Sequence, residues 1–423
     1  MPILLTRLSS PIGSLAAASM IALGAAPASS QDQSASQAIS GPNATPAVLQ
    51  SDAQAKDDML DVNLQRSWDA WKTRLKETSG LDLGFDYNAL GYAATSSLTD
   101  EDTTASGAFR VFGQWDLIDR EGLNTGSLIF KVENRHRYGD VAPADFGSEL
   151  GYAGLVSSVF NDQGWRLTNA YWKQDFAQKR GVAYIGFLDV TDYVDVYALA
   201  SPWTGFSNLA FETGSGTIGG LPDGALGAMV GGFLNDNFYA AASAVDANAD
   251  PTDPLAGFDN LSDQGETFKT LEFGWTSGPQ ALFVNNAHLT LWHIDARKEA
   301  GTREGKGVAF SYTHAVAEKW LPFVRGGWSE DGGSLYEASL SAGVGYSRNP
   351  GQDLLGVGVN WSRPNEDTFG AALDDQATIE VFQRLQLTEG IQITPSVQII
   401  HNPALNPDSE TVALFGLRLR AAF

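Results

Sequence analysis

The sequence TVALFGLRLRAAF, residues 411–423, ends the chain and decides its fold class. Polarity alternates along it with a period of two, which is typical of a β-strand. The face that ends at Phe423 is apolar, whereas the opposite face carries Arg418 and Arg420. A strand of a transmembrane barrel turns its apolar face to lipid and its charged face to a wet lumen, the reverse of a soluble protein. We therefore expect this segment to be a barrel strand.

The same alternation recurs through most of the chain after residue 80, with turn-forming combinations such as Asn349-Pro-Gly351 between the segments. At about ten residues per spanning strand and a similar length of connection, this region allows roughly 16 strands. The sequence predicts an all-β fold, a transmembrane antiparallel β-barrel of about 16 strands around a water-filled channel. Clear examples of alternation are residues 81–88, 271–275, 336–346 and 355–361.

The composition of the 423-residue chain agrees with this prediction. Its 45 Gly exceed the average share of about 7%, and its 11 Trp, 12 Tyr and 22 Phe suit a barrel with aromatic girdles. The absence of Cys excludes a disulfide scaffold. A formal net charge of −23 argues against nucleic-acid binding, which needs a basic surface. Acidic residues gather in loop-like stretches such as 246–259, which we interpret as solvated loops, with divalent-cation binding as the alternative.

The first 79 residues differ in character from the barrel, residues 80–423. Residues 1–30 are similar to a secretory signal peptide, with an apolar centre and Ala26-Pro-Ala28 as a cleavage site. Residues 31–56, rich in Gln, Ser, Ala and Pro, predict a disordered linker. Residues 57–79 predict a short amphipathic helix, because apolar residues recur every three or four positions. The helix is expected to pack at the barrel mouth or inside it, or else to form a periplasmic coiled coil.

The segment SLIFKVENRHRY, residues 127–138, is the strongest candidate for a functional site. It places four charged side chains on one face of a strand, Lys131, Glu133, Arg135 and Arg137. In a barrel wall they would form a ladder of mixed sign in the lumen, whose paired donors and acceptors suit neutral polyhydroxylated solutes. The alternative is a solvated polar face without selectivity. Further charges that could complete a constriction are Arg110, Glu380, Arg384, Arg418 and Arg420.

Motifs for catalysis or metal binding are weak. Residues 214–219 match GxGxxG, but no βαβ pattern surrounds them. The five histidines lack the spacing of a metal site. Asp246, Asn248 and Asp250 begin like a calcium loop, but Pro251 stands where that loop needs glycine. We expect a protein that is not an enzyme and has no catalytic residues, no cofactor and no metal.

Several stretches resemble the OprB-type family of carbohydrate-selective outer-membrane porins. They include Trp68–Leu75, residues 184–208 and 238–248, and the region from Glu380 to Phe423. The chain departs from the family pattern at Asp69, Ala70 and Lys72 in the helix and at Tyr197. The resemblance runs from about Arg66 to the C-terminus. It implies a channel of roughly 16 strands for sugars, with a constriction lined by arginine and glutamate.

The expected function is passive, carbohydrate-selective diffusion of mono- or oligosaccharides across the outer membrane of a Gram-negative bacterium. Aromatic faces such as those of Trp292 or Phe112 could stack on the sugar. The alternative is a general or anion-preferring porin, and less favoured are a barrel hydrolase or an adhesin. Ser311 and His314 fall on opposite strand faces, which argues against a hydrolase. Expected partners are sugars, outer-membrane lipid and the barrel-assembly machinery, through Phe423; a homotrimer is common for barrels of this size.

Overall fold

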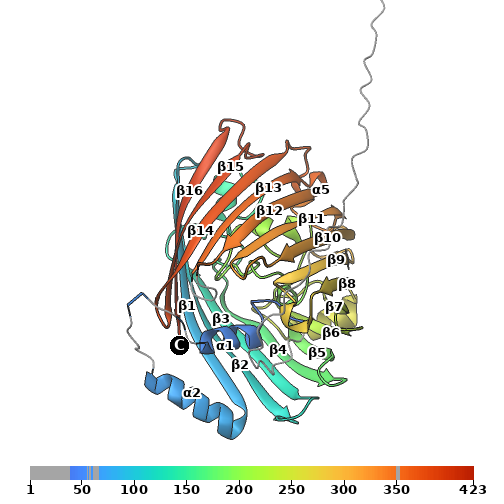
Figure 1. The fold of residues 1–423 in the computed structure, drawn as a ribbon. Coiled ribbons are helices and arrows are strands. Elements are labelled where there is room, and N and C mark those ends of the chain that lie inside the picture. The colour runs from blue at the N-terminus through green and yellow to red at the C-terminus, as the bar shows by residue number, and fades with distance from the viewer. Residues whose placement is uncertain (1–38, 55, 57–58, 61–65, 349–352) are drawn as a thin grey trace, which may run out of the picture. The chain divides into compact units, whose positions relative to one another are not determined.

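The backbone forms a closed antiparallel barrel of sixteen strands, in which each strand pairs with its neighbours in sequence and β1 pairs with β16 (Figure 1). This confirms the predicted fold class and strand number. Closure leaves no strand edge with unpaired backbone groups, which is the condition for a sheet to lie in a membrane. The computed structural model describes residues 39–54, 56, 59–60, 66–348 and 353–423.

The elements follow one another without a crossover. The strands are β1 Leu81–Ala94, β2 Thr103–Ile118, β3 Gly126–Arg137, β4 Gly164–Phe176, β5 Gly181–Leu188, β6 Ala225–Phe233, β7 Phe238–Asp246, β8 Thr267–Thr276, β9 Asn285–Ile294, β10 Gly305–His314, β11 Trp320–Asp331, β12 Tyr336–Tyr346, β13 Leu354–Pro364, β14 Gln376–Thr388, β15 Ile391–His401 and β16 Thr411–Ala422. The α-helices are α1 Thr45–Ala53, α2 Arg66–Ser79, α3 Phe146–Glu149, α4 Ala256–Asp259 and α5 Glu366–Phe369. Short turns of helix are η1 Val190–Asp192, η2 Leu209–Phe211, η3 Thr213–Gly216, η4 Asn260–Gln264 and η5 Pro279–Ala281.

The two faces of the wall differ in polarity as the alternation predicted. In β16, Phe415 and Leu417 are exposed on the outer surface, whereas Arg418 and Arg420 are each 4% exposed on the inner side. Exposed tryptophans lie near the strand ends, for example Trp320 at the start of β11. An apolar outer surface bounded by aromatic side chains matches the hydrocarbon layer of a membrane and its two interfaces.

The connections at the two ends of the barrel are unequal. Turns at the end that holds the C-terminus are mostly short, whereas the other end carries the longest connections, residues 138–163, 189–224 and 247–266. The β3–β4 loop (residues 138–163) and the β5–β6 loop (residues 189–224) are largely buried. Strand periodicity cannot predict this inward folding, because the two loop segments have no periodicity of their own.

The N-terminal region differs from the prediction in one part. Residues 39–54 were expected to belong to a disordered linker, but they have a defined structure that includes helix α1. Thr45 and Leu49 of this helix are buried, and the helix packs against β1, β2 and β3. The prediction failed here because low hydrophobicity indicates disorder only when a chain has no polar partners, and the barrel interior supplies them. The predicted signal peptide, residues 1–30, lies outside the described residues.

Helix α2 covers the second half of the helix predicted for residues 57–79; residues 57–58 and 61–65 lie outside the described part. The Trp68 ring lies 5.5 Å from that of Phe85 on β1. Phe85 precedes the inward-facing Asp86 and therefore belongs to the outer face of β1. Helix α2 thus packs on the outside of the wall at the end of the short turns, and Gly80, with φ of +79°, ends it. Among the described residues, no helix is both long and apolar enough to cross a membrane.

The polarity of the outer face gives a first prediction. Replacing Leu417, in the middle of β16, by arginine places a charge against lipid and should lower the free energy of unfolding by about 2–4 kcal/mol. Denaturant titration of the barrel folded in lipid vesicles measures this change. Thr411→Arg, at the end of the same strand, is the matched control and should cost about 0–1 kcal/mol. Equal losses for both variants would contradict the assignment of this face to lipid.

Candidate functional site

The β5–β6 loop crosses the barrel interior and is attached to the wall on several sides. On one side, the carboxylate of Asp192 accepts hydrogen bonds from Lys131 Nζ of β3 (3.2 Å) and from Asn169 Nδ2 of β4 (2.8 Å). Lys131, which the sequence placed in the lumen, therefore positions the start of this loop.

The wall formed by β14 and β16 holds the middle of the same loop through its backbone. Glu380 accepts hydrogen bonds from the N–H groups of Ser207 (2.9 Å) and Asn208 (3.0 Å). Arg418 donates to the carbonyl oxygens of Pro202 (2.7 Å) and Gly205 (2.8 Å). Arg384 donates to the carbonyl oxygen of Thr204 at 3.3 Å. These three predicted site residues thus lie in the interior, where they fix the loop in place.

The opposite wall holds the loop through Asp195. Its carboxylate pairs with Arg325 of β11 and accepts a hydrogen bond at 2.7 Å from His288 Nε2 of β9. The Asp195 N–H donates to Glu272 of β8 at 2.7 Å. Since buried ionic groups are costly when one partner is missing, these pairs specify the position of the loop.

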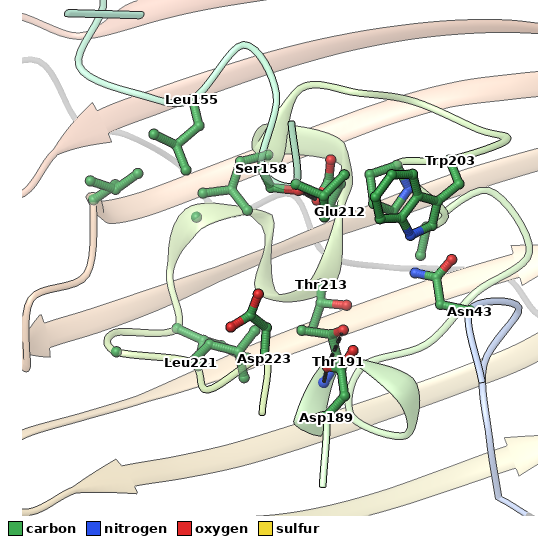
Figure 2. A pocket seen from close by; sticks show the side chains of 18 of the residues that line it. Asn43, Leu155, Ser158, Asp189, Thr191, Trp203, Glu212, Thr213, Leu221 and Asp223 are labelled. Carbon is green, nitrogen blue, oxygen red and sulfur yellow. Dashed lines mark hydrogen bonds between the residues drawn. The ribbon is translucent and has the colours of Figure 1, made fainter. Parts of the chain in front are cut away.

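A cavity of about 340 Å³ lies between the two inward loops and β3. The β5–β6 loop contributes Trp203, Glu212 and Asp223, whose side chains surround the same space in Figure 2. The β3–β4 loop adds apolar lining with Leu155 and Val159. The cavity therefore combines an aromatic ring, apolar surface and ionisable groups. Its lining from β3 consists of Lys131, Glu133 and Arg135.

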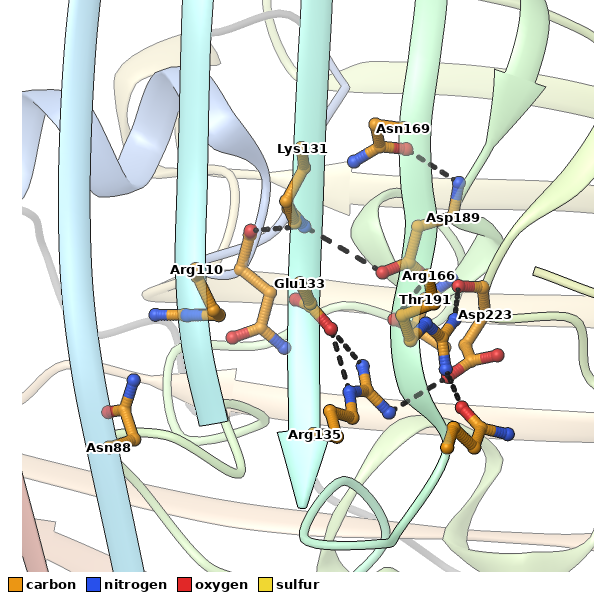
Figure 3. A network of polar contacts seen from close by, with 12 residues as sticks. Asn88, Arg110, Lys131, Glu133, Arg135, Arg166, Asn169, Asp189, Thr191 and Asp223 are labelled. Carbon is orange, nitrogen blue, oxygen red and sulfur yellow. Dashed lines mark hydrogen bonds and ion pairs between the residues drawn. The ribbon is translucent and has the colours of Figure 1, made fainter. Parts of the chain in front are cut away.

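The ionisable groups at the cavity form a connected network (Figure 3). Arg135 Nε donates to Glu133 at 2.7 Å, and Arg135 Nη1 donates to Asp223 at 3.3 Å. Arg166 of β4 also donates to Asp223, from Nη1 at 2.8 Å. Each guanidinium in this set is thus matched by a carboxylate, and the wall offers both donors and acceptors.

Arg110 lies beside this network, beneath Trp203. Its guanidinium pairs with Asp86 of β1 and lies 4.2 Å from the centroid of the Trp203 ring. Such a cation–π contact fixes the indole where it lines the cavity. Phe160 packs against the same ring in an edge-to-face arrangement, with centroids 5.2 Å apart.

Arg137 and Arg420, the remaining predicted site residues, lie away from the cavity. Arg137 ends β3, is exposed and pairs with Asp162 at 3.2 Å. Arg137 lies two residues after Arg135 and thus has the same phase in the strand. Phase, however, does not indicate where the strand ends. Arg420 lies inside the barrel and pairs with Asp86 and with Asp52 of α1.

Most partners of these charged side chains were not predicted from the sequence. A signal existed for Arg325, because it alternates with the exposed Val324, but no periodicity marks the inward residues of the β5–β6 loop. Trp203, rather than the expected Trp292 or Phe112, is the aromatic residue among those that line the cavity. The other missed residues are Arg166, Asp192, Asp195, Asp223, Glu272 and His288.

Burial and neighbouring charges change the acidity of the loop carboxyls. Burial raises the pKa of Glu212 well above its ordinary range. Burial, together with the nearby Asp192, raises the pKa of Asp189 to about 7. Burial alone would also raise the pKa of Asp223, but the guanidinium groups of Arg166 and Arg135 outweigh this effect and lower the pKa to about 2. Of these three loop carboxyls at the cavity, Asp223 is firmly ionised, whereas Asp189 and Glu212 are more readily protonated.

No group of three or more His, Cys, Asp or Glu side chains that could hold a metal ion occurs in the described part of the chain. A closed barrel of sixteen strands with an apolar outer face, a polar interior and a loop folded inward defines the porin class of channel proteins. Porins are channels rather than enzymes.

The chain belongs to the family described as "Carbohydrate-selective porin, OprB family", which matches residues 100–307 and 311–423. It is similar to porin AaxA of Chlamydia felis (strain Fe/C-56), with 27% identity over 153 residues, and to porin AaxA of Chlamydia abortus (strain DSM 27085 / S26/3), with 25% over 155 residues. Each match spans only about a third of either chain (34%).

The fold is similar to the high-pH structure of Pseudomonas putida OprB, with a TM-score of 0.69 and 16% identity over 87% of this chain and 99% of that one. The family and the barrel fold confirm the expected class and imply the outer membrane of a Gram-negative bacterium.

The raised pKa of Asp189 gives a prediction for ion selectivity. As the pH falls from about 8 to about 6, Asp189 gains a proton and no longer offsets the charge of Lys131, so the ratio of anion to cation permeability should rise. Reversal potentials across a planar bilayer with a salt gradient measure this ratio. Asp189→Asn should abolish the change, whereas Asp236→Asn, in an exposed turn, should keep it. A titration in Asp189→Asn equal to that of the wild type would contradict the assignment.

Proposed function

We propose that the protein is a passive diffusion channel for mono- or oligosaccharides, and that the cavity beside β3 is its sugar-selective region. The observation that carries the proposal is the composition of this cavity. It places Trp203 next to Arg135, Glu133 and Asp223, whose charges are paired with one another. The description of the family as carbohydrate-selective supports the same conclusion.

This arrangement suits a neutral sugar for two physical reasons. Each hydroxyl of a sugar donates and accepts hydrogen bonds, and the network offers both carboxylate acceptors and guanidinium donors. The C–H surface of the sugar ring favours the apolar and aromatic lining of Leu155, Val159 and Trp203. Paired charges also attract a free ion less strongly than unpaired ones. The pore therefore favours uncharged solutes.

Diffusion requires that binding be weak enough for release. Hydrogen bonds between sugar and wall replace hydrogen bonds to water, so each contributes only about 0.5–1.5 kcal/mol net, or up to about 3 kcal/mol with a charged partner. A few such contacts give an affinity that slows a sugar without trapping it. Transport then follows the concentration gradient.

A general or anion-preferring porin is the second candidate. The guanidinium groups of Arg384 and Arg418 face loop carbonyl oxygens rather than carboxylates, which leaves positive charge in the interior. The two candidates differ in sugar binding, since an anion-preferring pore would conduct without measurable block by sugars.

We infer that outer-membrane lipid surrounds the barrel and that the barrel-assembly machinery recognises its last strand. Phe423 is exposed on the outer surface, while its backbone N–H and carbonyl pair with those of Phe85 on β1. The terminal residue is thus part of the seam that closes the barrel. A homotrimer stays a prediction.

Substitution of Arg135 tests the proposed site. Arg135→Ala removes a charged donor, and the sugar concentration that blocks half of the single-channel current should rise about tenfold, which corresponds to about 1.4 kcal/mol. Bilayer recordings with a panel of glucose-like sugars measure the block. Arg137→Ala is the matched control, because this neighbouring arginine of the same strand is exposed at its end. Sugar block that is equal in wild type and Arg135→Ala would contradict the proposed site, and its absence from the wild type would favour the general porin.

A further inference from the structure

Residues 39–54, called here the luminal segment, are held inside the barrel by contacts along their length. The Gly41 N–H donates to the carbonyl oxygen of Asp192 in the β5–β6 loop at 2.6 Å. Lys131 Nζ donates to the carbonyl oxygen of Asn43 at 3.3 Å. Helix α1 then packs against β1, β2 and β3 (Figure 1). The segment therefore reaches from the β5–β6 loop to the wall.

The helix ends at a carboxylate clamp. Both oxygens of Asp52 accept hydrogen bonds from Arg420 of β16, Oδ1 from Nη1 at 2.9 Å and Oδ2 from Nη2 at 2.7 Å. Arg420 Nε donates to Asp86 at 2.9 Å, and Asp86 also pairs with Arg110. Positive and negative groups thus alternate in the order Arg110, Asp86, Arg420 and Asp52. The bidentate contact between Arg420 and Asp52 belongs to the strongest class of charged hydrogen bonds.

The contacts with the barrel explain why the luminal segment has a defined structure. Helix α1 has only nine residues and no side-chain hydrogen bond at its N-cap. Isolated helices of this length are marginal in water. The clamp at Asp52 and the buried side chains of Thr45 and Leu49 therefore hold it in the barrel.

Asp52 also changes the charge of the wall. Without it, Arg110 and Arg420 would share the single carboxylate Asp86. Arg384 of β14 lies close enough to Arg418 and Arg420 of β16 to interact with both electrostatically. Burial opposes ionisation of Asp52, but the guanidinium of Arg420 outweighs it and lowers the pKa of the carboxyl below its ordinary value. Asp52 is therefore ionised at neutral pH.

We propose that the luminal segment is a specificity-determining wall of the pore, which narrows the passage beside the cavity and uses Asp52 to cancel the excess positive charge of the arginines on β14 and β16. Asn43 of this segment lines the cavity itself, so solute passes the segment on its way through. The inference deepens the proposed function and rests on it in one respect, namely that conduction runs through this cavity.

Ion selectivity in the absence of sugar tests the charge. In the full mature chain, Asp52→Asn should raise the anion-to-cation permeability ratio several-fold and increase the single-channel conductance, because the clamp is lost and Arg420 is less neutralised. Asp52→Glu keeps the carboxylate and should stay close to wild type. Glu77→Gln, on helix α2 outside the barrel, is the matched control for the loss of one acidic residue.

Thiol labelling tests the position of the segment, and it is clean because the chain has no native Cys. Asn43→Cys treated with a charged methanethiosulfonate reagent should lose conductance, whereas Ala70→Cys, exposed on α2, should be labelled without effect. Deletion of residues 39–54 should raise conductance. Circular dichroism checks that each variant is a folded barrel.

The outcomes separate this inference from the proposed function. Unchanged selectivity in Asp52→Asn together with unchanged current after labelling of Asn43→Cys would overturn it, whether or not the deletion variant folds. A selectivity change in Asp52→Asn without any sugar block in the wild type would support the luminal segment and contradict the sugar channel.

Discussion

Pairing between β1 and β16 is the constraint on which the rest of the structure depends. In hydrocarbon, each backbone N–H or C=O without a partner costs several kcal/mol, so the sheet must close on itself. The register that closes it pairs Asn88 with Arg420 and brings Phe85 to Phe423. Closure also creates an interior separated from lipid. Polar segments that would be unstable against hydrocarbon, such as the β5–β6 loop and residues 39–54, can fold there.

Charged pairs in this interior contribute more to geometry than to net stability. Taking two charges out of water costs about as much as their attraction returns, whereas losing one partner of a buried pair costs about 3–5 kcal/mol. Displacement of the β5–β6 loop is therefore unfavourable on every side. It would break the pairs Asp192–Lys131 and Asp195–Arg325 and the hydrogen bonds to Glu380. A fixed loop gives a cavity of fixed shape, which selectivity requires.

The sequence predicted the barrel and the phase of its strands, because alternation is a local property. The inward direction of Arg418 and Arg420 followed from residues 411–423 alone. The partners of these side chains did not, since Arg420 meets Asp52 and Arg418 meets Pro202, far away in the chain. The alternation of a strand also does not indicate how deep in the barrel a residue lies. Arg137 was therefore predicted to share the lumen with Arg135, although it lies at the strand end. The order of residues 39–54 was missed because their composition carries no information about the arginine that binds them.

The local pairing of charges explains how an acidic protein can hold many arginines in the interior of its barrel. The net charge of −23 is a sum over the whole chain, and salt screens the exposed part of it beyond a Debye length of about 8–10 Å. Charges inside the barrel act at short range in a lower dielectric, so their effect depends on the nearest partner. Arg135 faces Glu133 and Asp223, and Arg420 faces Asp86 and Asp52. The proposed preference for an uncharged solute rests on this pairing of Arg135 and Arg420 with carboxylates, and it does not depend on the total charge of the chain.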